Sequence, residues 1–282
     1  MNLFRCSILV LLFVFSGSAS ISAAETAPKT VSIHQLPPAA QKTVKDELGD
    51  SKLVQIEKDE EDGEVTYVVT RKVKDEDRDF VVAEDGTLSS VEVTLDETPP
   101  VVQKAIKAQL RDGTLESIEK TFEGNDINYE IEMTTKSGED RSFTVALDGK
   151  LTSVQVTLEE IPPSVRKTIE AHLGNGKLVD IFRLVEGNEV SFDAEVDHDG
   201  KLRDVIVSPS GKLESLQVML SEIPPEAQKT IRDKIGSGKI SRIDQSFTPR
   251  QGVHPYDVEG RKDGKPFNFA VGPRGRFLGM DQ

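Results

Sequence analysis

The side chains that most often perform chemistry in proteins occur in this sequence without the spacing that catalysis requires. The four histidines lie at unrelated positions: His34, His172, His198 and His254. The one cysteine, Cys6, precedes an apolar run near the N-terminus, and neither an HExxH zinc motif nor a GxSxG nucleophile motif occurs. We therefore expect no catalytic residues, no cofactor and no enzymatic activity.

One acidic stretch, "EVDHDGKLRDVI", has a spacing that merits comparison with a calcium loop. It places Glu195, Asp197 and Asp199 at alternate positions before Gly200. A calcium loop of the EF-hand type needs a glutamate at its twelfth position, and Ile206 stands there. A hairpin turn with solvated acids is the favoured account, and we expect no metal ligands. A calcium sensor that uses the acidic turns remains a further hypothesis, which predicts that calcium raises the melting temperature.

Charge and N-terminal composition narrow the classes of partner and the compartment. The net charge of −14 opposes binding to nucleic acid, whose phosphates require basic clusters, and leaves a protein as the expected partner. Arg5 precedes an apolar run from Ile8 to Phe15, and small residues then lead to Ala24. This pattern predicts a signal peptide over residues 1–24 and a secreted or periplasmic protein. The apolar run is too short to span a bilayer, so no transmembrane segment is expected.

The elements that would position any site repeat along the chain. The phrase "EEIPPSVRKTIEAHL" from Glu159 has counterparts from His34, Asp96 and Ser221, at a period of about 62 residues. The period predicts four tandem repeats, over residues 31–95, 96–158, 159–220 and 221–282. The spacing leaves little room for flexible linkers, so neighbouring repeats are expected to support one another.

Within each repeat the spacing of the apolar residues changes once, from that of a helix to that of a strand. After the prolines, Val165, Ile169 and Leu173 form the stripe of a short amphipathic helix, and prolines suit the first turn of a helix. Further on, Tyr129 alternates with polar neighbours in "INYEIEM", and Asp148-Gly149 marks a hairpin turn. The predicted fold class is α+β, with each repeat formed by one short helix packed on an antiparallel sheet of about four strands. Left-handed helix ends are expected at Gly49, Gly113, Gly174 and Gly236.

Three pieces of this pattern carry a resemblance to a known family. They are Leu36-Pro37-Pro38, the Glu61-Asp62-Gly63 turn with Tyr67, and the closing hairpin Asp148-Gly149-Lys150-Leu151. Together they resemble the PepSY-like domain and the related beta-lactamase-inhibitor-like family of secreted bacterial proteins. The resemblance implies an envelope or secreted protein that binds other proteins, with inhibition of a peptidase or another hydrolase as the suggested activity. It implies no catalytic residues.

Aromatic side chains supply the first candidates for contact with a partner. Tyr67, Tyr129, Phe192 and Tyr256 recur at one place in the repeat and are predicted to be core. Phe122, Phe182 and Phe247 occur near the end of the first strand at less regular positions. We interpret these three as candidate interface residues, with core packing as the alternative.

The fourth repeat differs most from the others, because it is net basic and ends in "KPFNFAVGPRGRFLGMDQ". One hypothesis makes Arg274, Arg276 and Phe277 a contact site, either for an acidic neighbouring repeat or for an anionic partner. The alternative is that this repeat is atypical because it caps the array.

Two functions of different classes follow from the repeats. In the first, the array is a non-catalytic binding module that docks a protein partner through loops and open sheet faces, with paired sheets laid side by side into one concave surface. In the second, it is a structural spacer of the envelope without inhibitory activity. The identity of the partner and the oligomeric state do not follow from the sequence.

Overall fold

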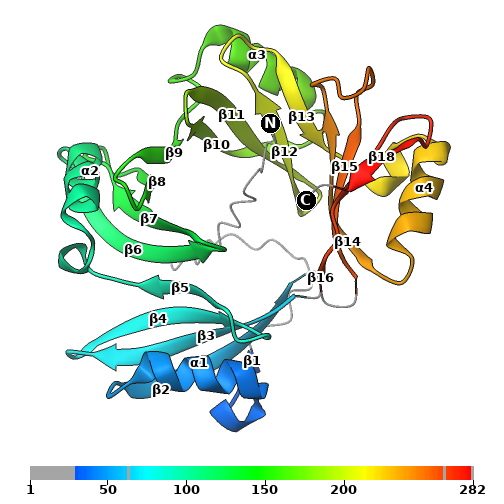
Figure 1. The fold of residues 1–282 in the computed structure, drawn as a ribbon. Helices are drawn as coiled ribbons and strands as arrows, with labels where there is room; N and C mark the ends of the chain where they lie inside the picture. Colours follow the sequence, from blue (N-terminus) through cyan, green and yellow to red (C-terminus); the bar gives the residue numbers. More distant parts are fainter. Residues whose placement is uncertain (1–28, 62–63, 263–264, 281–282) are drawn as a thin grey trace.

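The chain folds into helix-and-strand units that are joined edge to edge along a curved sheet (Figure 1). The computed structural model describes residues 29–61, 64–262 and 265–280. The predicted signal peptide and the Asp62-Gly63 turn lie outside the described residues. Within these ranges the chain forms four α helices, which are α1 (Pro38–Leu48), α2 (Pro100–Leu110), α3 (Pro163–His172) and α4 (Pro225–Ile235).

Each helix begins what we call a unit and is followed by antiparallel strands. Unit 1 contains β2 (Lys52–Glu61), β3 (Glu64–Val73), β4 (Glu76–Ala83) and β5 (Leu88–Glu92). Unit 2 contains β6 (Thr114–Glu123), β7 (Asp126–Thr134), β8 (Asp140–Ala146) and β9 (Leu151–Gln155). Unit 3 contains β10 (Lys177–Glu186), β11 (Glu189–His198), β12 (Lys201–Val207) and β13 (Leu213–Gln217). Unit 4 contains β14 (Lys239–Ser246), β15 (Tyr256–Lys262), β16 (Lys265–Pro266), β17 (Phe269–Val271) and β18 (Phe277–Met280). The mixed α+β class predicted from the sequence is confirmed.

The paired prolines start the helices, as predicted. Pro37 is the N-cap of α1, and the second proline, Pro38, is the first helical residue. Proline fits there because its missing N–H would have no intrahelical partner. The stripe that follows is the buried face: Val102 and Ile106 of α2 are both 0% exposed. Full burial of such a side chain stabilises the fold by roughly 1.5–3 kcal/mol.

Strand alternation completes a separate core under each helix. Tyr67, Tyr129, Phe192 and Tyr256 are all buried against the helix of their own unit, which confirms their predicted role as core residues. Their strand neighbours must point to the opposite face of the sheet. We call this opposite face, which no helix covers in the described chain, the inner face.

Consecutive units share one sheet, because the last strand of each unit pairs with the first strand of the next. The pairs are β5 with β6, β9 with β10 and β13 with β14, all antiparallel. We call these the first, second and third junctions. All four helices lie on the outer side of the resulting arc, and the inner face lines its centre (Figure 1). The sheets of neighbouring units therefore lie side by side on a concave surface.

An ion pair fixes each junction from the helix side. Arg78 on β4 donates from Nη1 to Oε2 of Glu97 at 2.7 Å, just before α2. Arg141 contacts Glu160 at 2.8 Å, and Arg203 contacts Glu222 at 2.9 Å. Each glutamate also accepts a backbone N–H three residues earlier, as Glu97 does from Thr94 at 2.7 Å. These bonds tie the strands of one unit to the start of the next helix.

Closing hairpins with glycine lie against the helix starts. Gly211 has φ +85°, and a Cβ there would lie 2.7 Å from the Cβ and carbonyl oxygen of Ser164 in α3. The carbonyl of Gly211 accepts a bond from Thr168 Oγ1 at 2.6 Å. Glycine is required both by the left-handed backbone and by this close approach.

Two details differ from the simple repeat. The left-handed end of α2 is Arg111, with φ 50°, and not the predicted Gly113. At the N-terminal edge, β1 (Lys29–Thr30) pairs with β2, and the Val31 N–H donates to Ile56 O at 2.9 Å. This short strand occupies the place that the last strand of a preceding unit takes at the three junctions.

Candidate functional site

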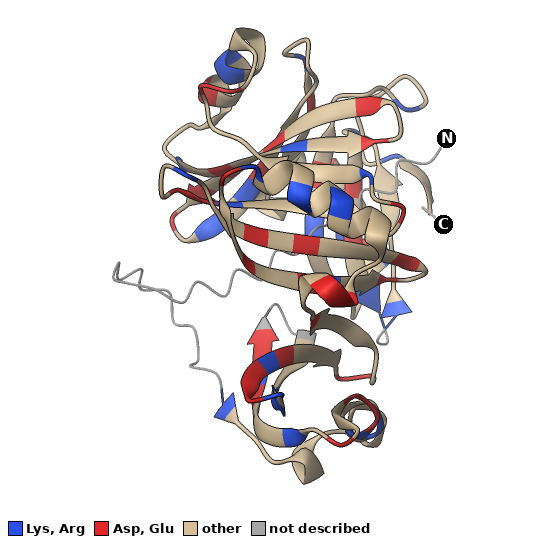
Figure 2. Ribbon diagram, turned by 90° about the vertical axis from the view of Figure 1, so that its left-hand side faces the viewer, with Lys and Arg blue, Asp and Glu red and all other residues tan. Residues whose placement is uncertain are grey.

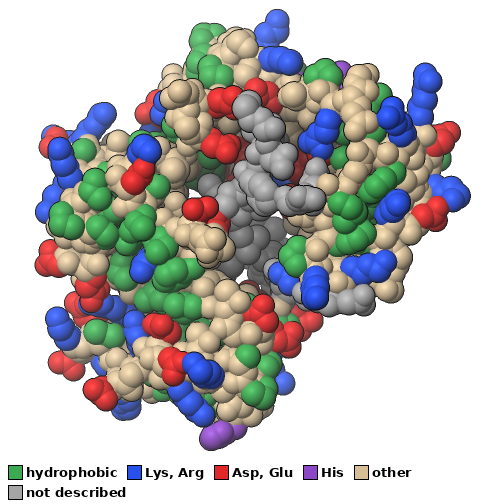
Figure 3. Space-filling model, in the orientation of Figure 1, with side chains coloured by type: hydrophobic (Ala, Val, Ile, Leu, Met, Phe, Trp, Pro, Cys, Tyr) green, Lys and Arg blue, Asp and Glu red, His purple; other side chains and the backbone are tan. Residues whose placement is uncertain are grey.

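The inner face carries many carboxylates, because the residues between core positions on the strands are often acidic. Glu130, for example, stands between the buried Tyr129 and Ile131. Acidic side chains border the centre of the arc in the space-filling view (Figure 3). The outward helix α2 instead carries two lysines and no acidic residue (Figure 2). The inner face is therefore the acidic side of the sheet in this part of the molecule.

The first junction gathers carboxylates from four strands. They are Asp79 on β4, Glu92 on β5, Glu119 on β6, and Glu130 and Glu132 on β7. Glu119 is paired in register with both Glu92 and Glu130 on its two neighbouring strands. Oε2 of Glu92 accepts the backbone N–H of Asp79 at 3.2 Å. The sheet register thus brings together acids that are distant in sequence.

These carboxylates are hard to ionise together. Burial, with the neighbouring carboxylates of Glu119, Glu123 and Glu132, raises the pKa of Glu130 to about 7. Burial also raises the pKa of Glu119 and of Glu92, and nearby carboxylates add to both shifts. Burial and like charges both disfavour the ionised form, so these carboxylates lie where a bound cation would favour their ionisation. Such a place can bind a cation.

The third junction has a cation of its own. The guanidinium of Arg242 on β14 binds Asp244 through Nε at 2.6 Å and through Nη2 at 2.9 Å, and Nη1 bonds to Asp204 on β12. Beside it, burial and the carboxylates of Asp204 and Asp180 raise the pKa of Glu195 to about 7. The arginine therefore joins units 3 and 4 across the inner face.

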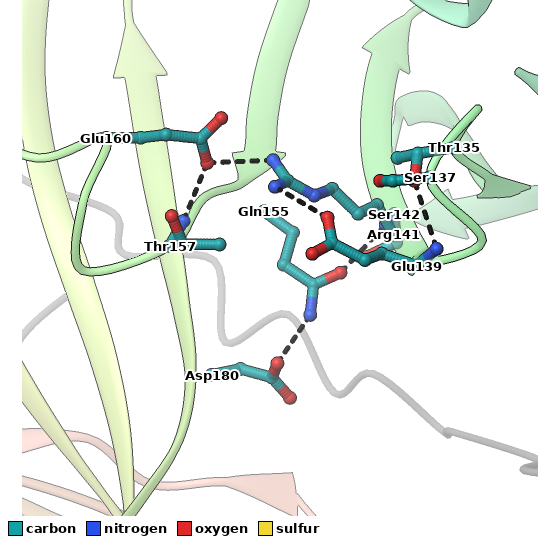
Figure 4. A network of polar contacts seen from close by, with 9 residues as sticks. All are labelled: Thr135, Ser137, Glu139, Arg141, Ser142, Gln155, Thr157, Glu160 and Asp180. Atoms are coloured by element: carbon teal, nitrogen blue, oxygen red, sulfur yellow. Dashed lines mark hydrogen bonds and ion pairs between the residues drawn. The ribbon is translucent and has the colours of Figure 1, made fainter.

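The second junction is held by an amide (Figure 4). The side chain of Gln155 donates to Asp180 and accepts the backbone N–H of Ser142 at 2.9 Å. Arg141 lies nearby and binds Glu160. A hollow of about 340 Å³ opens between these strands, with Arg141, Gln155 and Asp180 among its lining. The three junctions therefore share one backbone plan and differ in the side chains that contact their acids.

The structure separates the aromatic candidates. Phe122 packs against the core of unit 1 with Lys120 Nζ 4.8 Å from its ring centroid, as the core alternative describes. Phe182 alternates with the buried Ile181 and so lies on the inner face, in register with Gln155. Phe247 follows β14, and its ring centroid lies 6.0 Å from that of His254. The three do not form one surface.

The C-terminal candidates lie around one turn beside α4. Arg274 and Arg276 are exposed on either side of Gly275, whose Cβ would lie 2.6 Å from the Glu226 carbonyl oxygen. Arg276 donates to Gln251 at 3.0 Å. Phe277 packs against the core of unit 4, under Lys234. A partner contact at the two arginines stays a prediction.

The remaining chemistry is sparse in the described ranges. No group of three or more His, Cys, Asp or Glu residues there is arranged to hold a metal ion. The histidines stay apart, and His172 Nδ1 lies 2.7 Å from the Thr168 carbonyl oxygen within α3. None of the described helices has the length and apolar character needed to cross a membrane. The inner-face carboxylates were not predicted as a site, although their alternation with core residues is visible in the sequence.

A comparison with known protein families finds a match in the first half of the chain. Residues 15–90 and 87–153 match the model of a family described as "Putative beta-lactamase-inhibitor-like, PepSY-like". These two segments are similar to the PepSY-like family. They include α1 and α2, and the match to the second segment ends within β9. No curated protein matches the chain.

Several solved structures are similar to parts of this chain. A "putative periplasmic protein" of the DUF2874 family from Bacteroides vulgatus is 16% identical, with a TM-score of 0.30 over 46% of this chain and 97% of that one. A DUF2874 family protein from Bacteroides ovatus is 14% identical, with a TM-score of 0.32 over 42% and 85%. A BLIP-like protein from Bacteroides fragilis is 19% identical, with a TM-score of 0.29 over 41% and 82%.

Proposed function

We propose that this protein is a non-catalytic binding module of the bacterial periplasm or exterior, whose inner face holds a basic segment of a protein partner. The PepSY-like organisation extends in this proposal to all four repeats, with units 3 and 4 as further copies. The compartment is supported by the N-terminal residue pattern and by the description of the Bacteroides vulgatus neighbour as periplasmic.

One observation carries the proposal: the concave inner face is lined with carboxylates whose pKa values are raised. Glu130 and Glu195, with pKa values of about 7, lie in units 2 and 3 and so extend the acidic surface along the arc. A basic segment would lower the electrostatic cost of ionising them, which is the gain that favours binding. Charge complementarity of this kind also speeds encounter with the partner.

Inhibition of a peptidase or another hydrolase is the more specific form of the proposal. It is supported by the family description, which names beta-lactamase-inhibitor-like proteins, and by the position of Phe182 on the same inner face. An aromatic side chain beside acidic groups offers an anchor for a partner.

A structural spacer is the second candidate, and the ion pairs at the junctions favour it. The bonds of Arg78, Arg141 and Arg203 to the next unit would stiffen an array whatever its inner face does. If the protein is a spacer, replacing the charged residues of the inner face should leave its function unchanged.

The test compares two variants of the mature chain, residues 25–282, as bait for extracellular and periplasmic proteins of its own source. The inner variant combines Glu119→Gln, Glu130→Gln and Glu132→Gln. The outer variant removes the same charge from the helices by Glu47→Gln, Glu170→Gln and Glu226→Gln. We expect the wild type and the outer variant to capture one basic protein stoichiometrically at low salt, and the inner variant to lose it.

The captured protein is then identified, and any hydrolase is assayed with increasing bait. Dose-dependent loss of its activity would support the inhibitor form. Equal behaviour of the inner and outer variants, or absence of a stoichiometric basic partner, would reject the inner-face proposal in favour of the spacer.

A further inference from the structure

The first and third junctions have the same arrangement of carboxylates around different centres. In the third junction Arg242 is in register with Glu259, and in the first Ser117 is in register with Glu132. A one-residue bulge precedes both Arg242 and Ser117. The matching carboxylates are Asp79 and Asp204, Glu119 and Asp244, Glu130 and Asp257, and Glu132 and Glu259.

The third junction shows which ligand this arrangement holds. Two of its carboxylates, Asp204 and Asp244, bind the Arg242 guanidinium directly, through three hydrogen bonds from different nitrogens. A guanidinium is planar and carries five N–H donors, so it can bind two carboxylates at once, here on β12 and β14, which lie on either side of β13. The junction therefore contains a formed guanidinium site that the chain fills by itself.

The first junction lacks that guanidinium and is more acidic. Ser117 replaces Arg242, and its hydroxyl donates to Glu132 at 3.0 Å. Glu92 stands where the third junction has the neutral Gln217, and both accept a backbone N–H at 3.2 Å. Asp79 and Glu132 are exposed, so the acids can be reached from solvent.

We propose that the first junction binds an arginine side chain of a partner protein, with its guanidinium in the place that Arg242 takes in the third junction. This inference rests on the proposed binding function and specifies its chemistry. Arginine suits the site better than lysine because the carboxylates come from separate strands and require several directed donors. A metal ion is a poorer occupant, because the described acids do not converge as a set of metal ligands.

The first experiment uses N-acetyl-L-arginine amide as a probe, titrated into the full mature chain and followed by calorimetry or NMR. We expect one saturable site with a dissociation constant on the order of 1–10 mM, the scale of a single charged side chain. The lysine analogue should bind several-fold more weakly, and the neutral citrulline analogue should not bind.

Two variants test the location. Ser117→Arg supplies the guanidinium from the chain itself and should weaken probe binding at least about tenfold, while the fold is kept. Arg242→Ser empties the third junction and should raise the stoichiometry from one site to two. If Arg242→Ser does not fold, Ser117→Arg and the lysine and citrulline analogues still test whether the first junction binds a guanidinium.

The inference is overturned if the wild type shows no saturable binding, if Ser117→Arg binds the probe as well as the wild type does, or if the lysine analogue binds equally. It is also overturned if calcium displaces the probe at equal concentration. Failure here is separable from failure of the proposed function. A partner that is lost with the inner variant but kept by Ser117→Arg leaves the inner-face function intact and removes only the arginine site.

Discussion

Replacing Glu130 with glutamine should stabilise the protein at alkaline pH and change its stability little near pH 4.5. The folded structure raises the pKa of this carboxyl from 4.5 to about 7, through burial and the acids around it. Between these values the folded state binds more protons than the unfolded state does. The free energy of unfolding must therefore fall as pH rises through this window, and the loss is complete above about pH 7.

The size of the effect follows from the shift. A change from 4.5 to about 7 corresponds to an upper value of about 3 kcal/mol at pH 8. Partial contact of the group with water reduces this value. We therefore expect Glu130→Gln to raise the free energy of unfolding, relative to the wild type, by roughly 1–3 kcal/mol more at pH 8 than at pH 5. Glutamine keeps the shape of the side chain and removes only the charge.

Urea unfolding followed by far-UV circular dichroism at about pH 5 and pH 8 measures the effect. Glu189→Gln, at an exposed carboxylate on β11, is the matched control and should leave the difference between the two pH values unchanged. The reasoning would be refuted if Glu130→Gln and Glu189→Gln showed the same pH dependence as the wild type. It would also be refuted by a loss of stability in Glu130→Gln at pH 8.

Further predictions concern the fold. Arg78→Ala removes the part-buried bond to Glu97 and should lower the free energy of unfolding by about 1–3 kcal/mol, measured by urea unfolding; an unchanged midpoint would contradict a role for the pair in stability. Gly211→Ala and Gly200→Ala have nearly equal φ of +85° and +82°, but only Gly211 faces the helix at Ser164. In both variants the strained backbone should lower the free energy of unfolding by about 1 kcal/mol. In Gly211→Ala the clash with Ser164 should lower it by a further roughly 1–3 kcal/mol. Equal melting temperatures of the two variants would rule out the helix contact.

Local features of the fold could be predicted because their causes lie within a few residues. The prolines before α1, the stripe of Val102 and Ile106, and the core position of Tyr129 each follow from short-range periodicity. The end of α2 was harder, because Arg111 takes a left-handed conformation that sequence rules assign to glycine.

Long-range features could not be predicted in the same way. The pairing of Ser90 with Thr121 joins strands that have a whole helix between them, and no turn residue signals such a pairing. The first junction depends on this register, because it sets Glu92 beside Glu119. The acidic positions were therefore visible in sequence, whereas their convergence was not. Packing of Phe122 on the core of the preceding unit has the same cause.

The shared backbone plan of the junctions has a consequence for how such a protein can evolve. Because strand pairing and a helix-side ion pair join the units at all three junctions, the inner-face residue at the centre of each junction can change while these links are kept. Ser117, Asp180 and Arg242 occupy this one position in three successive junctions. Duplication of a unit thus lengthens the sheet and adds one more junction, whose central side chain can change independently of the others. The chain can diversify its ligands one junction at a time while its scaffold stays constant.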